Sequence, residues 1–101
     1  MERKVKINPI AINDIKEIKE YIKEENTSAI THSIKRITDS IENLAQFPEL
    51  SMDLSKKIAL KTNYRYLIVD EYIIFYKLNS EYLFVYRVLS GKRDYMKILF
   101  E

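Results

Sequence analysis

The apolar residues of this chain change their spacing at Pro48, and that change limits the folds open to it. Before Pro48, isoleucines recur at intervals of three and four residues. After Pro48, the apolar residues come in dense runs of Ile, Val, Tyr and Phe. The first pattern is typical of amphipathic helices and the second of β-strands. Because 101 residues make about one domain, we expect residues 1–101 to form a single α+β domain.

Two helices are predicted before Pro48. Asn8 and Pro9 form a start signal, because asparagine caps a helix and proline costs little in its first turn. A stripe then predicts a helix of about four turns, with Asp14 assigned to its charged side; the stripe is Ala11, Ile15, Ile18 and Ile22. After a break at residues 24–28, a second stripe predicts a longer helix that ends near Phe47-Pro48. The short break favours an antiparallel helical hairpin.

The strands are predicted from alternation and composition. Residues 4–8 alternate charged and apolar side chains, as a short strand does. Residues 49–57 are expected to form a loop, and residues 58–61 suggest a short strand. Three richer runs follow at 64–69, 72–78 and 82–89, and their short connections require antiparallel hairpins. The tail, 94–101, fits a short helix or an edge strand, and both remain open.

These elements predict one architecture. A helical hairpin must bury its isoleucine stripe, and the sheet offers the only large apolar surface. We therefore expect an N-terminal strand and a two-helix antiparallel hairpin, packed on one face of a three- to four-stranded antiparallel sheet.

Missing residue types exclude several classes of function. The chain has no cysteine, so disulfides, thiolate catalysis and cysteine zinc sites are excluded. Its one histidine, His32, rules out multi-histidine metal sites and is interpreted as a helix-surface residue. Its one glycine, Gly91, rules out glycine-rich phosphate loops and is expected to adopt a positive φ in a turn. Asp70-Glu71 is interpreted as a turn. No metal and no cofactor are expected.

Nothing in the sequence indicates a membrane protein. The run from Tyr72 to Tyr76 has five apolar residues, whereas a spanning helix needs about 20. The charged N-terminus is not followed by the apolar segment of a signal peptide. We expect a cytoplasmic protein with no membrane contact.

The charge of the chain is uneven. The formal net charge is +2, with a slight acidic excess up to residue 50 and a basic excess after it. This imbalance suggests a basic face built by the second half, although an ordinary solvated surface would give the same pattern.

Three segments of the chain resemble the RelE/ParE superfamily, the toxins of type II toxin–antitoxin pairs. They are Tyr64–Val69, Tyr72–Tyr76 and the stretch Arg87-Val88-Leu89-Ser90-Gly91-Lys92-Arg93-Asp94. The resemblance extends over nearly the whole chain and implies two helices on a twisted antiparallel sheet. It also implies growth inhibition, a role in plasmid stabilisation and a cognate antitoxin partner. RelE-like members cut mRNA on the ribosome, whereas ParE-like members inhibit DNA gyrase.

The resemblance also marks candidate site residues. RelE-like nucleases use lysines, arginines and a late tyrosine; Arg65 and Arg93 match family arginines and can bind phosphate. The position of the nucleases' late tyrosine falls near Leu99 in this chain, and a leucine cannot transfer a proton. Tyr95 can take the role of that tyrosine only if the tail folds differently. Lys56, Lys57 and Lys61 lie in the right region at the wrong spacing.

These departures favour a ParE-like inhibitor of DNA gyrase. The alternatives are a ribosome-dependent mRNA endonuclease that uses Arg65, Arg93 and Tyr95, and an inert member that only pairs with an antitoxin. Enzymatic activity therefore stays open. The candidates for binding the target or the antitoxin are Lys57, Lys61, Arg65, Arg87, Lys92 and Arg93.

Two interpretations are left open at the sheet. Arg87 shares its alternation with Leu83, Val85 and Leu89, so it either forms a structural ion pair or binds a partner. Six tyrosines suggest that part of one sheet face is tyrosine-rich, either as a partner surface or as core; they are Tyr64, Tyr66, Tyr72, Tyr76, Tyr82 and Tyr86.

Overall fold

The computed structural model describes residues 3–25, 27–47, 52–57 and 61–100. In chain order the elements are β1 (Lys4–Ile7), α1 (Pro9–Glu25), α2 (Thr27–Gln46), β2 (Met52–Asp53), α3 (Leu54–Lys57), β3 (Arg65–Val69), β4 (Tyr72–Leu78), β5 (Tyr82–Ser90) and α4 (Tyr95–Phe100). The strands form one sheet in the order β1-β5-β4-β3-β2. None of the helices within these ranges is long and apolar enough to cross a bilayer.

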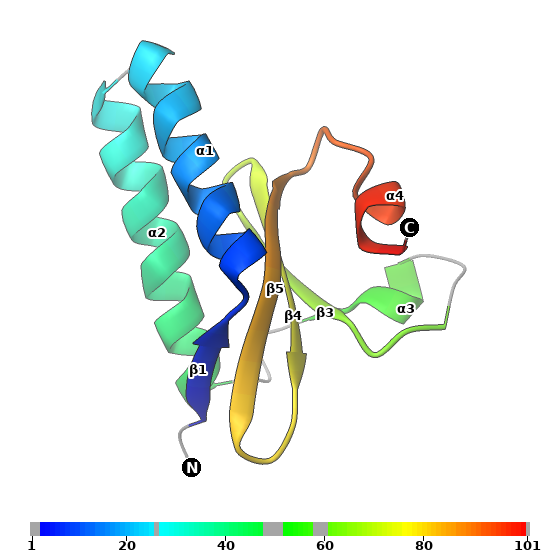
Figure 1. Cartoon of the computed structure of the whole chain (residues 1–101). Coiled ribbons are helices and arrows are strands. Elements are labelled where there is room, and N and C mark those ends of the chain that lie inside the picture. The colour runs from blue at the N-terminus through cyan, green and yellow to red at the C-terminus, as the bar shows by residue number, and fades with distance from the viewer. Residues whose placement is uncertain (1–2, 26, 48–51, 58–60, 101) are drawn as a thin grey trace.

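The sheet lies between two helical layers of unequal size. Helices α1 and α2 run antiparallel to each other along one face, and the short helices α3 and α4 lie on the other (Figure 1). This arrangement confirms the predicted α+β fold and the helical hairpin on one sheet face. The second layer is the addition that the sequence did not predict.

The sheet has five strands instead of three or four, and one pairing is parallel. Strands β2, β3, β4 and β5 pair antiparallel, as expected for the strands after Pro48. Strand β1 joins the free edge of β5 in parallel, with Val5 opposite Leu83. Alternation predicts a strand but says nothing of its direction, and the long connection from β1 to β5 is what a parallel pairing needs.

Residues 49–57 are not entirely loop. Met52–Asp53 adds a short antiparallel strand to the edge of β3, and Leu54–Lys57 forms a helical turn. Leu54 is fully buried and anchors this turn. The predicted strand at 58–61 falls outside the described residues except for Lys61, which has no regular structure. The tail is a helix, α4, and not an edge strand.

The helix boundaries follow the predicted signals. The Asn8 side-chain Oδ1 accepts a hydrogen bond from the Ile10 N–H at 3.0 Å, and Pro9 is the first residue of α1. Helix α2 ends at Gln46, two residues before Pro48. Both ends therefore confirm the sequence prediction.

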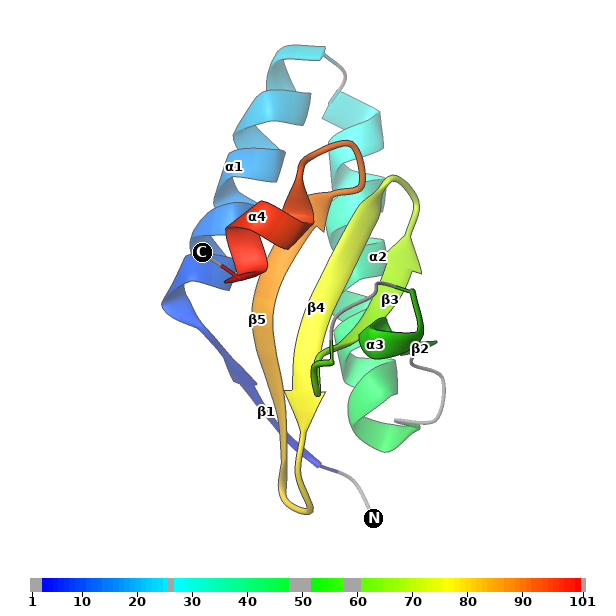
Figure 2. The same cartoon turned by 90° about the vertical axis from the view of Figure 1, so that its right-hand side faces the viewer.

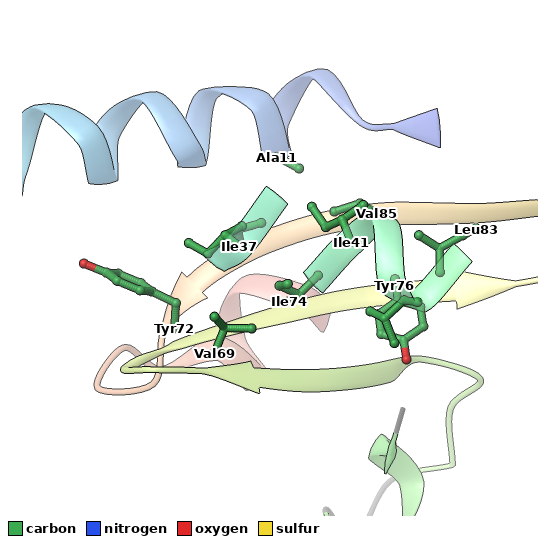
Figure 3. Close-up of a cluster of buried hydrophobic side chains, with 11 residues drawn as sticks. Ala11, Ile37, Ile41, Val69, Tyr72, Ile74, Tyr76, Leu83 and Val85 are labelled. Atoms are coloured by element: carbon green, nitrogen blue, oxygen red, sulfur yellow. The ribbon is translucent and has the colours of Figure 1, made fainter. Parts of the chain in front are cut away.

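Apolar residues are buried on both faces of the sheet. Between the sheet and the long helices, Ile37 and Ile41 of α2 pack over Ile74 and Val85 (Figure 3). A second cluster between the sheet and the short helices consists of Leu54, Tyr66, Ile73, Phe75 and Leu89. Because side chains alternate along a strand, both sets can come from the same strands.

A register shift in β5 breaks the expected alternation. Phe75 pairs with Arg87 and the next residue, Tyr76, pairs with Val85, so Tyr86 has no partner on β4. The extra residue is a β-bulge. It moves Leu89 to the face opposite Leu83 and Val85, so the shared face predicted for these three residues is wrong.

Candidate functional site

Two adjoining cavities lie beside α3 and share Lys57. The first has a volume of about 630 Å³ and is lined by Met52, Asp53, Lys56, Lys57, Arg65 and Tyr66. The second, about 340 Å³, is lined by Lys57, Ile68, Asp70, Glu71, Ile73, Gly91, Lys92 and Tyr95. We call this pair of cavities the basic groove, after its four cations Lys56, Lys57, Arg65 and Lys92.

Helix α3 sets the position of two of these cations. The Asp53 carboxylate accepts hydrogen bonds from the Ser55 N–H at 3.0 Å and the Ser55 hydroxyl at 2.7 Å, which caps the helix. The same bonds lower the pKa of Asp53. With Leu54 buried beneath, Lys56 and Lys57 stay exposed. The Lys57 ammonium lies 5.1 Å from the centre of the Tyr66 ring.

Arg65 is the half-buried first residue of β3. It lies opposite Asp53 on β2 and Tyr76 on β4. Its guanidinium acts to lower the pKa of Tyr76, but burial has the larger effect and raises that pKa to about 12. The groove therefore places Arg65 near the lysines of α3.

Lys92 and Arg93 follow Gly91 beyond the end of β5, and both are exposed. Lys92 lines the basic groove. Arg93 lines a third cavity of about 400 Å³ with Glu17, Glu71, Tyr72, Ser90 and Lys92; this cavity shares Glu71 and Lys92 with the second cavity of the groove. The turn is held by the Gly91 N–H, which donates to the Glu71 carbonyl at 2.9 Å.

The two arginines matched to the nuclease family are not brought together. Arg65 pairs with Tyr76 in the second half of β4, whereas Ser90, three residues before Arg93, pairs with Tyr72, the first residue of β4. Tyr72 and Tyr76 are four residue steps apart along β4, about 13 Å at about 3.3 Å per residue. Arg65 and Arg93 therefore line different cavities.

Tyr95 and Leu99 of the C-terminal helix α4 differ in their position relative to the groove. Tyr95 lines the groove, and its ring packs on Phe75 with centres 5.3 Å apart. Leu99 packs against the buried cluster of Tyr66, Phe75 and Leu89. The helical tail thus puts an apolar side chain at the position where the nuclease pattern has a tyrosine.

Arg87 lies outside the groove in an ion pair. Its Nε and Nη2 each donate to the Asp14 carboxylate at 2.8 Å, and the Val88 N–H donates to the same carboxylate at 3.0 Å. The bond to Asp14 raises the pKa of Arg87. The structure therefore shows the ion pair that was one of the two interpretations of Arg87.

Asp14 was missed by the sequence analysis. It is 4 % exposed and is not on the charged side of α1. The missed signal is its spacing, because it comes three residues after Ala11 and one before Ile15, on the apolar side of the helix.

The remaining predictions concern turns and single residues. Gly91 does not have a positive φ, which corrects the prediction; the positive φ, 56°, belongs to Asp70 in the Asp70-Glu71 turn. His32 is exposed on α2, as predicted. Lys61 is exposed and is not among the residues that line the groove. In the part of the chain that the structure describes, no three acidic or histidine side chains gather as metal ligands.

The tyrosines divide between the two faces of the sheet. Tyr72 and Tyr76 are buried under the long helices. Tyr66 and Tyr64 belong to the opposite side, where the Tyr64 ring meets Tyr86 edge-on at 5.5 Å. The tyrosine-rich face of the prediction is therefore the one that carries α3 and α4.

The order of these elements, a β-strand and a helical hairpin followed by an antiparallel meander and a basic turn, is the fold of the RelE/ParE superfamily of toxins. Residues 5–95 match the family model described as the ParE toxin of the type II toxin–antitoxin system parDE. The chain belongs to this family. No curated protein matches the sequence.

Two solved structures share the fold. A chain of the chromosomal ParDE toxin–antitoxin system from P. aeruginosa aligns with a TM-score of 0.68 and 12 % identity, over 88 % of this chain and 96 % of that one. YafQ from E. coli strain BL21(DE3) aligns with a TM-score of 0.53 and 16 % identity, over 99 % and 100 % of the two chains.

Proposed function

We propose that this chain is the toxin of a type II toxin–antitoxin pair, that it stops growth by binding DNA gyrase, and that a cognate antitoxin neutralises it. Its membership of the ParE family supports the toxin activity. The structural likeness to the ParDE system of P. aeruginosa supports an antitoxin partner. The proposal implies a cytoplasmic location, where gyrase works.

The separation of Arg65 from Arg93 is the observation that favours inhibition of gyrase over cleavage of RNA. Cleavage of an RNA phosphodiester needs one group to take a proton, one to give a proton and cations to stabilise the phosphorane. The two matched arginines line different cavities. Leu99, at the family's tyrosine position, is partly buried and packs against the cluster of Tyr66, Phe75 and Leu89. Inhibition by binding requires a complementary surface and no such catalytic group.

The basic groove supplies that surface. Lys56, Lys57 and Lys92 are exposed, and Arg65 is half-buried beside them. Asp53, Asp70 and Glu71 also line the groove, which leaves it a net charge of +1, but Asp53 is bonded to Ser55 and Asp70 to Arg36. This excess of exposed cations favours a partner with acidic groups, because complementary charges speed association and fix orientation. Lys57, Lys61, Arg65, Lys92 and Arg93 remain the candidates for contact with gyrase or the antitoxin, and Arg87 is the weakest because Asp14 occupies its guanidinium.

A supercoiling assay with purified toxin and gyrase tests the proposal. Wild-type protein should inhibit supercoiling at micromolar concentration, and Lys57→Gln and Lys92→Gln should each weaken the inhibition several-fold. Lys35→Gln is the matched control, because Lys35 is an exposed lysine on α2, away from the groove, whose ammonium lies 4.0 Å from the Asp39 carboxylate. Unaffected gyrase at micromolar wild-type protein would remove the proposal.

The second candidate is a ribosome-dependent mRNA endonuclease. It is favoured by one observation, that Tyr95 and Arg65 line adjoining cavities joined at Lys57. Primer extension on translated mRNA after induction should then show codon-linked cuts that Arg65→Ala and Tyr95→Phe reduce. An intact transcript in growth-arrested cells would argue against it.

A further inference from the structure

A second charged surface lies on the sheet face that α4 leaves open. Below α4, the lower parts of β5 and β4 have no helix in front of them (Figure 2). Strand β5 carries Tyr82, Phe84 and Tyr86 on this side, each half-buried. We call these three rings, with Lys6 and Lys77, the aromatic platform. None of its members lines the basic groove.

The register of the sheet places a lysine on each side of Phe84. Lys6 of β1 and Lys77 of β4 are both direct cross-strand partners of Phe84. Directly opposed residues share a face, so the three side chains form a row of charge, ring and charge across the sheet. Tyr82 precedes this row along β5 and Tyr86 follows it.

Contacts within the platform confirm that the charges and the rings are interleaved. The Lys6 ammonium lies 4.3 Å from the centre of the Tyr82 ring and 6.0 Å from that of Phe84. The Lys77 ammonium lies 5.1 Å from the centre of the Tyr86 ring and 4.4 Å from that of Tyr64. Tyr82 and Phe84 are themselves 5.5 Å apart. The platform contains two cations and no carboxylate; Glu81, in the adjoining turn, is exposed.

A small cavity borders the platform at the junction of β1 and α1. It has a volume of about 190 Å³ and is lined by Lys6, Ile7, Asn8, Pro9, Phe84, Val85 and Tyr86. Lys6, Phe84 and Tyr86 therefore face both the open sheet surface and a recess.

We propose that the aromatic platform binds single-stranded nucleic acid. Bases stack on exposed aromatic rings whatever their sequence, and ammonium groups beside those rings pair with the phosphates that link the bases. A lysine–ring contact at an exposed site is weaker than base–aromatic stacking, so an arriving base can replace the lysine, which then turns to a phosphate. An acidic protein segment would pair with the two lysines, but it would give the row of aromatic rings no role in binding.

This inference is independent of the proposed function. It concerns a surface that shares no residue with the basic groove, and it applies to a gyrase inhibitor and to an endonuclease alike. Loss of nucleic-acid binding would leave the gyrase result unchanged, and a negative gyrase result would leave this test unchanged.

Fluorescence anisotropy with labelled oligonucleotides of about ten nucleotides tests the proposal. The probes are single-stranded DNA, single-stranded RNA and a DNA duplex of the same length. We expect both single strands to bind more tightly than the duplex, because paired bases cannot stack on the platform. Equal affinity of the protein for single-stranded DNA and RNA would mean that binding depends on stacking and phosphate contacts. Tighter binding of RNA would mean that the 2′-hydroxyl makes a further contact.

Variants separate the rings from the charges. Phe84→Leu keeps an apolar side chain without a π face and should weaken single-strand binding roughly tenfold. Lys6→Gln and Lys77→Gln should each reduce the slope of log affinity against log salt by about 0.7. Lys19→Gln on α1 and Lys35→Gln on α2, both exposed lysines away from the platform and the groove, are the matched controls and should change little. Circular dichroism checks that each variant is folded.

Four outcomes overturn the proposal. The first is no binding of either single strand at low salt, and the second is a duplex that binds as well as the single strands. The third is equal loss in the platform variants and the two lysine controls, which would mean binding through net charge alone. The fourth is competition of poly-glutamate with the oligonucleotide, together with normal oligonucleotide binding by Phe84→Leu. That result would mean that the platform binds an acidic protein segment.

Discussion

Asp14 and Arg87 join the first long helix to the last strand through two hydrogen bonds of 2.8 Å, although 73 residues separate them in the chain. The Asp14 side chain is 4 % exposed and that of Arg87 is 22 % exposed. Asp14 also accepts the Val88 N–H at 3.0 Å, next to the β-bulge. One carboxylate therefore fixes both the guanidinium and the backbone of the bulged strand.

Removal of either partner should destabilise the protein strongly. Arg87→Met leaves the Asp14 carboxylate buried without its cation, and Asp14→Leu leaves both Arg87 and the Val88 N–H without an acceptor. Each should lower the free energy of unfolding by about 3–5 kcal/mol, as for other buried pairs that lose one partner. Urea unfolding followed by circular dichroism measures the change.

The double variant Asp14→Leu with Arg87→Met gives the control for this prediction. With both charges gone, no ion stays buried, so the double variant should be more stable than the sum of the single losses predicts. Single variants within about 1 kcal/mol of wild type would show that the pair is solvated in solution.

Tyr76 should make the protein sensitive to alkaline pH. Its side chain is fully buried, and burial raises its pKa to about 12 although the Arg65 side chain beside it acts in the opposite direction. Between pH 10 and 12 the unfolded chain loses this proton while the folded chain keeps it, so stability should fall as the pH rises through that range. The loss for two pH units is about 2–3 kcal/mol.

Tyr76→Phe tests this account directly. The variant should lie within about 1 kcal/mol of wild type at pH 7, because the buried hydroxyl is close to the Arg65 side chain but makes no hydrogen bond of good geometry with it. Its stability relative to wild type should then increase from pH 10 to 12. Comparison of the two pH curves removes the contribution of other groups, such as Tyr64, whose pKa is also raised by burial. Parallel curves would contradict the prediction.

Gly91→Ala should be tolerated. Gly91 has no positive φ, and an added Cβ would lie 3.6 Å from the Glu71 carbonyl oxygen and 3.7 Å from Cδ1 of Ile73, which are ordinary contacts. The substitution also reduces the entropy of the unfolded chain, so we expect a gain of up to about 1 kcal/mol in urea unfolding. A loss of about 2 kcal/mol or more would mean that the turn needs glycine.

Asp70 is the position where backbone conformation should matter. With φ at 56°, Asp70→Val should cost about 1–2 kcal/mol, because a β-branched residue is disfavoured there. Asp70→Asn should cost little, because asparagine adopts this conformation readily and only the exposed contact with Arg36 at 3.1 Å is weakened. Equal stability of the two variants, measured by thermal unfolding, would refute this assignment.

The sequence predicted the elements whose pattern is local. The isoleucine stripe of α2 gave its length, and Asn8-Pro9 gave the start of α1, because periodicity and capping depend on near neighbours. Strand β2 was missed because two residues are too few to show alternation. The parallel direction of β1 was missed because it depends on β5, which lies more than 70 residues away.

The candidate site was predicted less well, for the same reason. Arg65 and Lys57 were identified and share a cavity, but the distance between Arg65 and Arg93 depends on the register of β4. The bulge at Tyr86 could not be predicted from alternation, and it changed the expected neighbours of Arg87. Asp14 was recognisable in principle, as a carboxylate on the apolar side of a helix.

The most direct test of the central claim is gyrase supercoiling with the purified toxin, run beside primer extension on mRNA translated in its presence. The account predicts that supercoiling stops at micromolar toxin while the mRNA stays intact. Normal supercoiling together with codon-linked cuts in the mRNA would contradict it.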